Sequence, residues 1–104
     1  MDNQHYTLSI LPLFEKDLQD ARDHIAFELQ NPAAAMKLIE DTETAILKRL
    51  KNPLGFEPYH SKKDRKNPYY RIYIRNFTVF YVVIGNVMEV RRFVYSKRNL
   101  SEII

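Results

Sequence analysis

The chain has 104 residues, of which 45% are hydrophobic and 12% aromatic, enough for one folded domain and too few for two. It has no Cys, which excludes a disulfide-held fold and thiol chemistry, and no apolar run long enough to span a membrane. Residues 1–17 lack the basic start and apolar core of a signal peptide. We therefore expect a cytoplasmic protein that forms a single domain over residues 1–104.

The net charge of +3 conceals two halves of opposite sign. Residues 1–52 carry six Lys and Arg against nine Asp and Glu, whereas residues 53–104 carry ten against four. A basic half attached to an acidic half favours a surface that binds a polyanion or an acidic partner over a solvated surface that is merely uneven.

Residues 6–11 alternate between apolar and polar side chains, which predicts a half-buried strand that ends at Pro12. From Leu13 onward, apolar residues recur at steps of three and four, which predicts a helix with one apolar stripe. The stripe consists of Phe14, Leu18, Ala21, Ile25 and Leu29.

A second helix is predicted after Asn31-Pro32, because Asn is a good N-cap and Pro suits the first helical position. It should end near Lys51, before the Asn52-Pro53 pair. Because the break between the helices is short, they should form an antiparallel hairpin. The apolar stripe of the second helix consists of Ala35, Leu38, Thr42, Ala45, Ile46 and Leu50.

A loop over residues 54–68 precedes three predicted strands, and its length marks it as a candidate functional segment. The strands span Tyr69–Arg75, Phe77–Ile84 and Val87–Tyr95, with turns at Asn76 and Gly85-Asn86. In the first strand, Tyr70, Ile72 and Ile74 should share one face, and Tyr69, Arg71, Tyr73 and Arg75 the other.

This order predicts an α+β fold: an N-terminal strand, an antiparallel helical hairpin, and then a three-stranded antiparallel meander. One sheet packs on the hairpin, and its opposite face is left with Arg and Tyr side chains. Guanidinium groups grip phosphates and tyrosines stack on bases, and Glu89 is the one acid on these strands, so a binding face is favoured over a solvated one. The candidate residues of this face and its rim are Arg71, Tyr73, Arg75, one of Arg91 and Arg92, Tyr95, Lys97 and Arg98, and the loop adds Lys62, Lys63 and Arg65.

The sequence has no Gly-rich phosphate loop and no cluster with metal-ligand spacing, so we expect neither a metal nor a cofactor. RNA can be cleaved without a metal if cations steady the phosphorane and a Tyr, His or Lys moves protons. His60, in the basic loop, is a weak candidate base. The set that could in principle cleave RNA is Arg71, Tyr73, Tyr95, Lys97 and Arg98.

Five segments, taken together in order and spacing, resemble the RelE/ParE superfamily of toxins from bacterial type II toxin–antitoxin systems. They are residues 6–11, Asn31 to Ala35 at the helical bend, Tyr70 to Ile74, Phe77 to Val83, and Val90 to Asn99. The resemblance implies a RelE/ParE-like fold and a cytoplasmic toxin neutralised by a cognate antitoxin with an acidic or amphipathic segment.

The resemblance covers two branches with different targets. RelE-like members cleave mRNA on the ribosome, and for them it implies Arg71, Tyr95 and Arg98 as catalytic residues. ParE-like members poison DNA gyrase and are not known as nucleases. Tyr73 and Thr78 stand where the cleaving branch has basic residues, and the long hairpin is ParE-like, so gyrase is the favoured target. The alternatives are a ribosome-dependent mRNA endonuclease and an inactive member that only binds an antitoxin or RNA.

Overall fold

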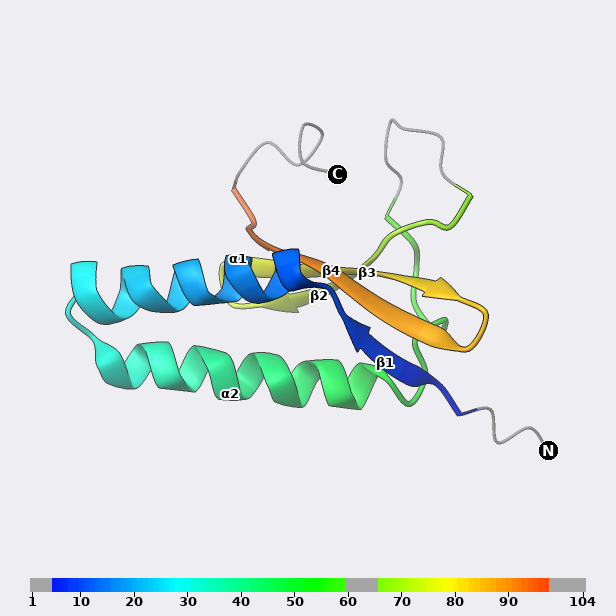
Figure 1. The fold of residues 1–104 in the computed structure, drawn as a ribbon, viewed down its shortest axis with the longest axis horizontal. Coiled ribbons are helices and arrows are strands. Elements are labelled where there is room, and N and C mark those ends of the chain that lie inside the picture. The colour runs from blue at the N-terminus through cyan, green and yellow to red at the C-terminus, as the bar shows by residue number, and fades with distance from the viewer. Residues whose placement is uncertain (1–4, 60–65, 98–104) are drawn as a thin grey trace.

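A computed structural model describes residues 5–59 and 66–97 of the chain (Figure 1). The predicted order of elements is confirmed: an N-terminal strand, a helical hairpin, and a three-stranded meander. The elements are β1 (Thr7–Ile10), α1 (Pro12–Asp23), a π-helical turn (His24–Glu28), α2 (Pro32–Arg49), β2 (Tyr70–Ile74), β3 (Phe77–Ile84) and β4 (Val87–Tyr95).

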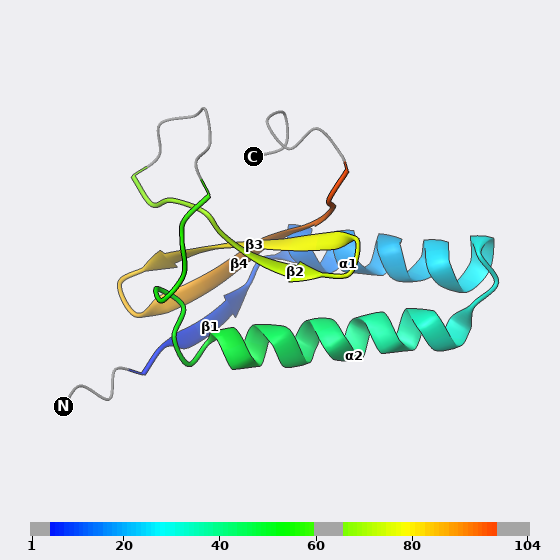
Figure 2. The ribbon, with the colours of Figure 1, turned by 180° about the vertical axis from the view of Figure 1, so that it is seen from behind.

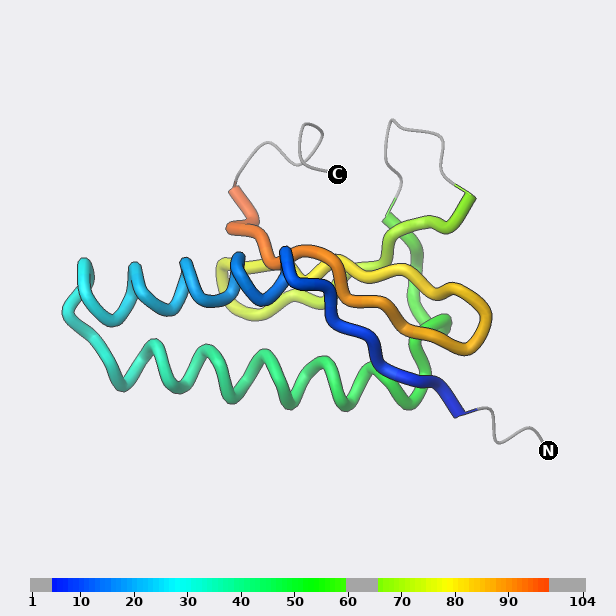
Figure 3. Tube along the Cα trace, viewed as in Figure 1, coloured from blue at the N-terminus to red at the C-terminus, as the bar shows by residue number. Residues whose placement is uncertain are grey.

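The four strands form one mixed sheet in the order β1-β4-β3-β2. β3 is antiparallel to both β2 and β4, as the meander requires, and Gly85 makes the turn to β4 with a positive φ of 62°. β1 lies parallel to β4, with Thr7 opposite Val87 and Ile10 opposite Val90, so the first and last strands are neighbours in the sheet (Figure 3). Sequence analysis did not predict the partner of β1.

The helical hairpin covers one face of the sheet, with α1 against β4 and α2 against β2 (Figure 2). Asn31 caps α2 as predicted, because its side chain accepts a hydrogen bond from the Ala34 N–H at 3.1 Å. Leu29, the last residue of the predicted apolar stripe, is 60% exposed. It lies at the bend of the hairpin, which projects past the end of the sheet (Figure 1). In the described part of the chain, no helix is long and apolar enough to cross a membrane.

The main core lies between the sheet and the hairpin. Strand alternation places Ile72, Val79 and Val90 on this inner face, where all three are buried. Phe14 of α1 meets Phe93 of β4 edge to face, with ring centroids 5.9 Å apart. The buried members of this core are Phe14, Leu38, Ile46, Tyr70, Ile72, Ile74, Val79, Tyr81, Met88, Val90 and Phe93.

A group of hydrogen bonds joins the end of α2 to the sheet. The fully buried Tyr81 hydroxyl donates to the Pro53 carbonyl at 2.7 Å, and Arg49 donates from Nη1 to the same hydroxyl at 3.0 Å. Arg49 Nη1 also donates to the Arg71 carbonyl of β2 at 2.9 Å. Burial raises the pKa of Tyr81, and the hydrogen bond and charge of Arg49 oppose that rise.

We expect Ile72→Asp to prevent folding, because the side chain is 6% exposed and the substitution buries a carboxylate without a partner. Tyr73→Asp, one residue further on the opposite face, should leave the chain folded, because Tyr73 is 64% exposed. Circular dichroism melting of both variants tests the assignment of strand faces. An unchanged melting temperature for Ile72→Asp would show that the faces are reversed.

The raised pKa of Tyr81 predicts a loss of stability at high pH. The fold favours the neutral phenol, so this contribution is present below the ordinary Tyr pKa of 10.0 and is lost as pH rises through the higher folded value. The free energy of unfolding should therefore fall more steeply above pH 10 in the wild type than in Tyr81→Phe. Parallel pH profiles for the two proteins in urea titrations would contradict this prediction.

Candidate binding surface

The outer face of the sheet, opposite the hairpin, carries a small apolar cluster as well as Arg and Tyr. Phe80 lies at its centre, edge to face with Tyr59 at 5.5 Å and with Tyr69 at 5.9 Å between ring centroids. Val82 and Val94 complete the cluster. The Arg and Tyr side chains predicted for this face therefore share it with apolar ones, and the segment after α2 returns to cover part of it. The Tyr59 N–H donates to the Tyr69 carbonyl at 2.6 Å and so holds that segment on the sheet.

Arg71 lies beside this cluster, between two tyrosines. Its guanidinium carbon is 5.0 Å from the ring centroid of Tyr59 and 5.6 Å from that of Tyr73. Both distances are within cation–π range, so the rings restrict the arginine side chain before any partner arrives. We call Tyr59, Arg71 and Tyr73 the Arg71 cluster. As predicted, Arg71 and Tyr73 share the outer face.

Arg91 is the second arginine associated with the outer face. Its Nε donates to Glu89 at 2.6 Å, and its guanidinium carbon is 5.8 Å from the ring centroid of Tyr69. Burial acts to lower the pKa of Arg91, but hydrogen bonds to Tyr69 and Glu89 outweigh it and raise the pKa overall. Arg91 is thus a charge already paired within the sheet, and its side chain offers less to a partner than Arg71 does.

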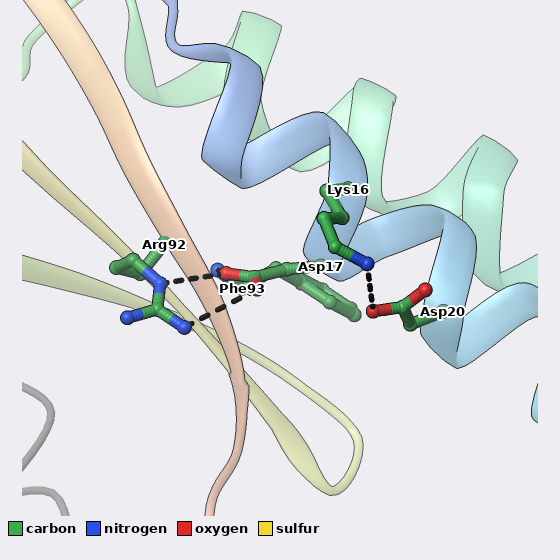
Figure 4. A network of polar contacts seen from close by, with 5 residues as sticks. All are labelled: Lys16, Asp17, Asp20, Arg92 and Phe93. Atoms are coloured by element: carbon green, nitrogen blue, oxygen red, sulfur yellow. Dashed lines mark hydrogen bonds and ion pairs between the residues drawn. The ribbon is translucent and has the colours of Figure 1, made fainter.

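Two other predicted surface arginines point back to the helices. Arg75 sits in the β2–β3 turn with a positive φ of 53° and forms an ion pair with Asp41 of α2. The prediction that it lines the outer face with Arg71 is wrong, because β2 ends at Ile74 and the turn redirects the side chain. Arg92 donates to Asp17 of α1 from Nε at 2.8 Å and from Nη2 at 3.2 Å (Figure 4).

Tyr95 lies on the helix side of the sheet, so its predicted place on the outer face is wrong. A β-bulge causes the reversal: Phe80 pairs with Arg92 and Tyr81 with Val90, which leaves Arg91 as the extra residue. Beyond the bulge, alternation is shifted by one, and the Tyr95 ring meets Phe77 edge to face at 5.7 Å. There it lines an open groove with Asp17 and Asp20 of α1 and His24 of the π-helical turn.

Of the remaining candidate residues, some lie in the described part of the chain and others lie outside it. Lys97 is exposed at the end of β4. Thr78, where the cleaving branch would have an arginine, is buried and shares a hydrogen bond of 2.8 Å with the Ser96 hydroxyl. Lys62, Lys63, Arg65 and Arg98 lie outside the described residues, as does His60.

Sequence reasoning missed two residues that shape this surface. Tyr59 comes from the loop, where an aromatic side chain beside a proline was the available signal. Arg49 caps the Arg71 carbonyl from α2, and nothing in its local sequence separates it from other solvated helix charges. Among residues 5–59 and 66–97, no group of three or more acidic, His or Cys side chains could hold a metal ion.

The family model of the ParE toxin of the type II toxin–antitoxin system parDE matches residues 8–100. The chain belongs to the ParE toxin family. A solved structure described as the chromosomal ParDE TA system from P. aeruginosa is similar to this ParE chain with a TM-score of 0.70 and 17% sequence identity. The match covers 90% of this chain and 99% of the other, and at that identity it supports the shared fold alone. No curated protein sequence matches the chain.

Asp17 is expected to matter for the stability of this ParE chain, since it accepts three hydrogen bonds, the third from the Phe93 N–H at 3.0 Å. Asp17→Ala leaves that N–H and Arg92 without their acceptor, and should lower the free energy of unfolding by about 2 kcal/mol. Lys16→Ala is the matched control, because it removes an exposed ion pair to Asp20 and should cost less than about 0.5 kcal/mol. Equal losses for the two variants in urea titrations would refute the role given to Asp17.

Proposed function

We propose that the chain acts in the cytoplasm as a single-domain toxin that inhibits bacterial growth by binding and poisoning DNA gyrase. The observation that carries this choice is the separation of two candidate catalytic residues. Arg71 lies on the outer face of the sheet, and Tyr95 lies on the helix side against Phe77.

Metal-free RNA cleavage needs a cation and a proton-transfer group around the same phosphate. Two side chains on opposite faces of one sheet do not meet at one phosphate. Thr78 adds no charge, and its hydroxyl is already bonded to Ser96. The separation of Arg71 from Tyr95 therefore favours a binding function over RNA cleavage.

The Arg71 cluster has instead the composition of a protein-binding hot spot. Tyr and Arg dominate the binding energy of many protein interfaces, and preorganised side chains lose less entropy on binding. Tyr73 is 64% exposed beside the half-buried Arg71, so a partner can contact both. These features support a protein target over a ribonuclease site.

The family also supports a cognate antitoxin as the physiological partner. We propose that its binding segment is acidic or amphipathic, because Lys66 and Lys97 are exposed cations of the basic half of the chain. A partner that binds only the folded toxin would also raise its stability.

Purified toxin should inhibit supercoiling by DNA gyrase, and a joint Arg71→Ala and Tyr73→Ala variant should need at least about tenfold more protein for the same inhibition. Lys16→Ala is the control, because it removes a surface charge of α1 and should leave inhibition unchanged. Folded wild-type protein that leaves supercoiling unaffected at saturating amounts would overturn the proposal.

The same preparations separate the alternatives. Cleavage of mRNA on ribosomes that is lost in Arg71→Ala and in Arg98→Ala would establish the endonuclease instead. Normal growth on expression of folded wild-type protein, with neither activity, would identify an inactive member that only binds its antitoxin or RNA.

A further inference from the structure

The sheet has two edge strands, which differ in whether a side chain occupies their outer hydrogen-bonding groups. At the β2 edge, Arg49 reaches from α2 and donates to the Arg71 carbonyl, so a side chain occupies a site where another strand could pair. β1 forms the other edge. Its N–H groups at Thr7 and, just past the strand, at Leu11 donate toward β4, at 2.8 Å and 3.0 Å.

Alternation along β1 therefore turns the N–H and C=O groups of Leu8 and Ile10 away from β4. No described residue forms a hydrogen bond with these groups. An extended peptide laid against β1 would find main-chain donors and acceptors in place, which is the basis of strand addition. Because β1 has four residues, the paired part of that peptide is short.

Next to this edge, an apolar groove of about 200 Å³ opens between β1 and the two helices. Leu8 and Ile10 of β1 form one wall, and α1 and α2 form the others. Ile10 is 40% exposed and Leu47 is 56% exposed, so the groove presents apolar surface to solvent. Its lining is Leu8, Ile10, Phe14, Glu15, Leu18, Thr42, Glu43, Ile46 and Leu47.

The charges of the lining indicate the chemistry of an occupant. Glu15 and Glu43 are exposed members of the lining, and neither has an ion-pair partner among the described residues. The lining contains no Lys or Arg, so the groove attracts cations.

We propose that the β1 edge binds an extended segment of another protein, which adds as a strand beside β1. One of its side chains is apolar and enters the groove, and Lys or Arg residues at the ends of the segment face Glu15 and Glu43. This site is separate from the Arg71 cluster, and the proposal does not depend on gyrase as the target.

A synthetic peptide with the order Lys-Thr-Val-Thr-Thr-Thr-Lys tests the proposal, because one face of its extended form carries Lys, Val, Thr and Lys. Titrated into ¹⁵N-labelled full-length chain, it should shift the amide signals of Leu8 and Ile10 and slow their hydrogen exchange. The same peptide with Glu in place of both Lys should bind at least tenfold more weakly.

Variants of the protein locate the contacts. The joint Glu15→Gln and Glu43→Gln variant should weaken the Lys peptide about tenfold and abolish its advantage over the Glu peptide. Lys16→Ala on α1 is the control and should change neither affinity.

Four results would overturn the proposal. The first is binding of the Lys peptide without changes at Leu8 and Ile10, and the second is equal binding of the two peptides. The third is a change at β1 that depends on protein concentration alone, which would make a second copy of the chain the occupant. Absence of any peptide binding at millimolar concentration would equally reject it.

Discussion

The arrangement of this molecule depends on one edge of β4, along which both β1 and a side chain of α1 form hydrogen bonds. β4 has nine residues, but β1 pairs only with its first four, because Pro12 has no N–H to continue the ladder and begins α1 instead. Further along that edge, the Asp17 carboxylate of α1 accepts the hydrogen bond of the Phe93 N–H. The Asp17 side chain thus takes the place of a strand partner for β4 beyond the end of β1. This hydrogen bond fixes α1, and with it the hairpin, against the sheet.

Most of the fold was predictable because its signals are local. The alternation around Ile72 and the helical spacing around Leu38 each identify an element and its buried face. The parallel pairing of β1 with β4 has no such signal, since it joins segments about 80 residues apart. The bulge at Arg91 is also invisible, because one extra residue depends on how two strands register, yet it reverses every side chain that follows.

The candidate site was likewise predictable where local alternation determines it, and not beyond a turn or a bulge. Arg71 and Tyr73 lie before any irregularity, and alternation places them correctly. Arg75 lies in the turn after β2 and Tyr95 lies beyond the bulge, so alternation does not place their side chains. The charge asymmetry of the two halves also has an internal component: Arg75 and Arg92 of the basic half pair with Asp41 and Asp17 of the acidic half. Part of the positive charge of the basic half therefore forms ion pairs that hold the helices on the sheet.

What remains for partners is divided between two surfaces of different chemistry. The Arg71 cluster, on the outer face, combines aromatic rings with a cation. The β1 edge, which opens on the helix side, combines apolar walls with two carboxylates and free main-chain groups. Because the sheet separates them, a segment bound along β1 leaves the outer face accessible. A partner that blocks both surfaces must reach around the β1 edge, with a basic stretch on one side and an acidic or aromatic stretch on the other.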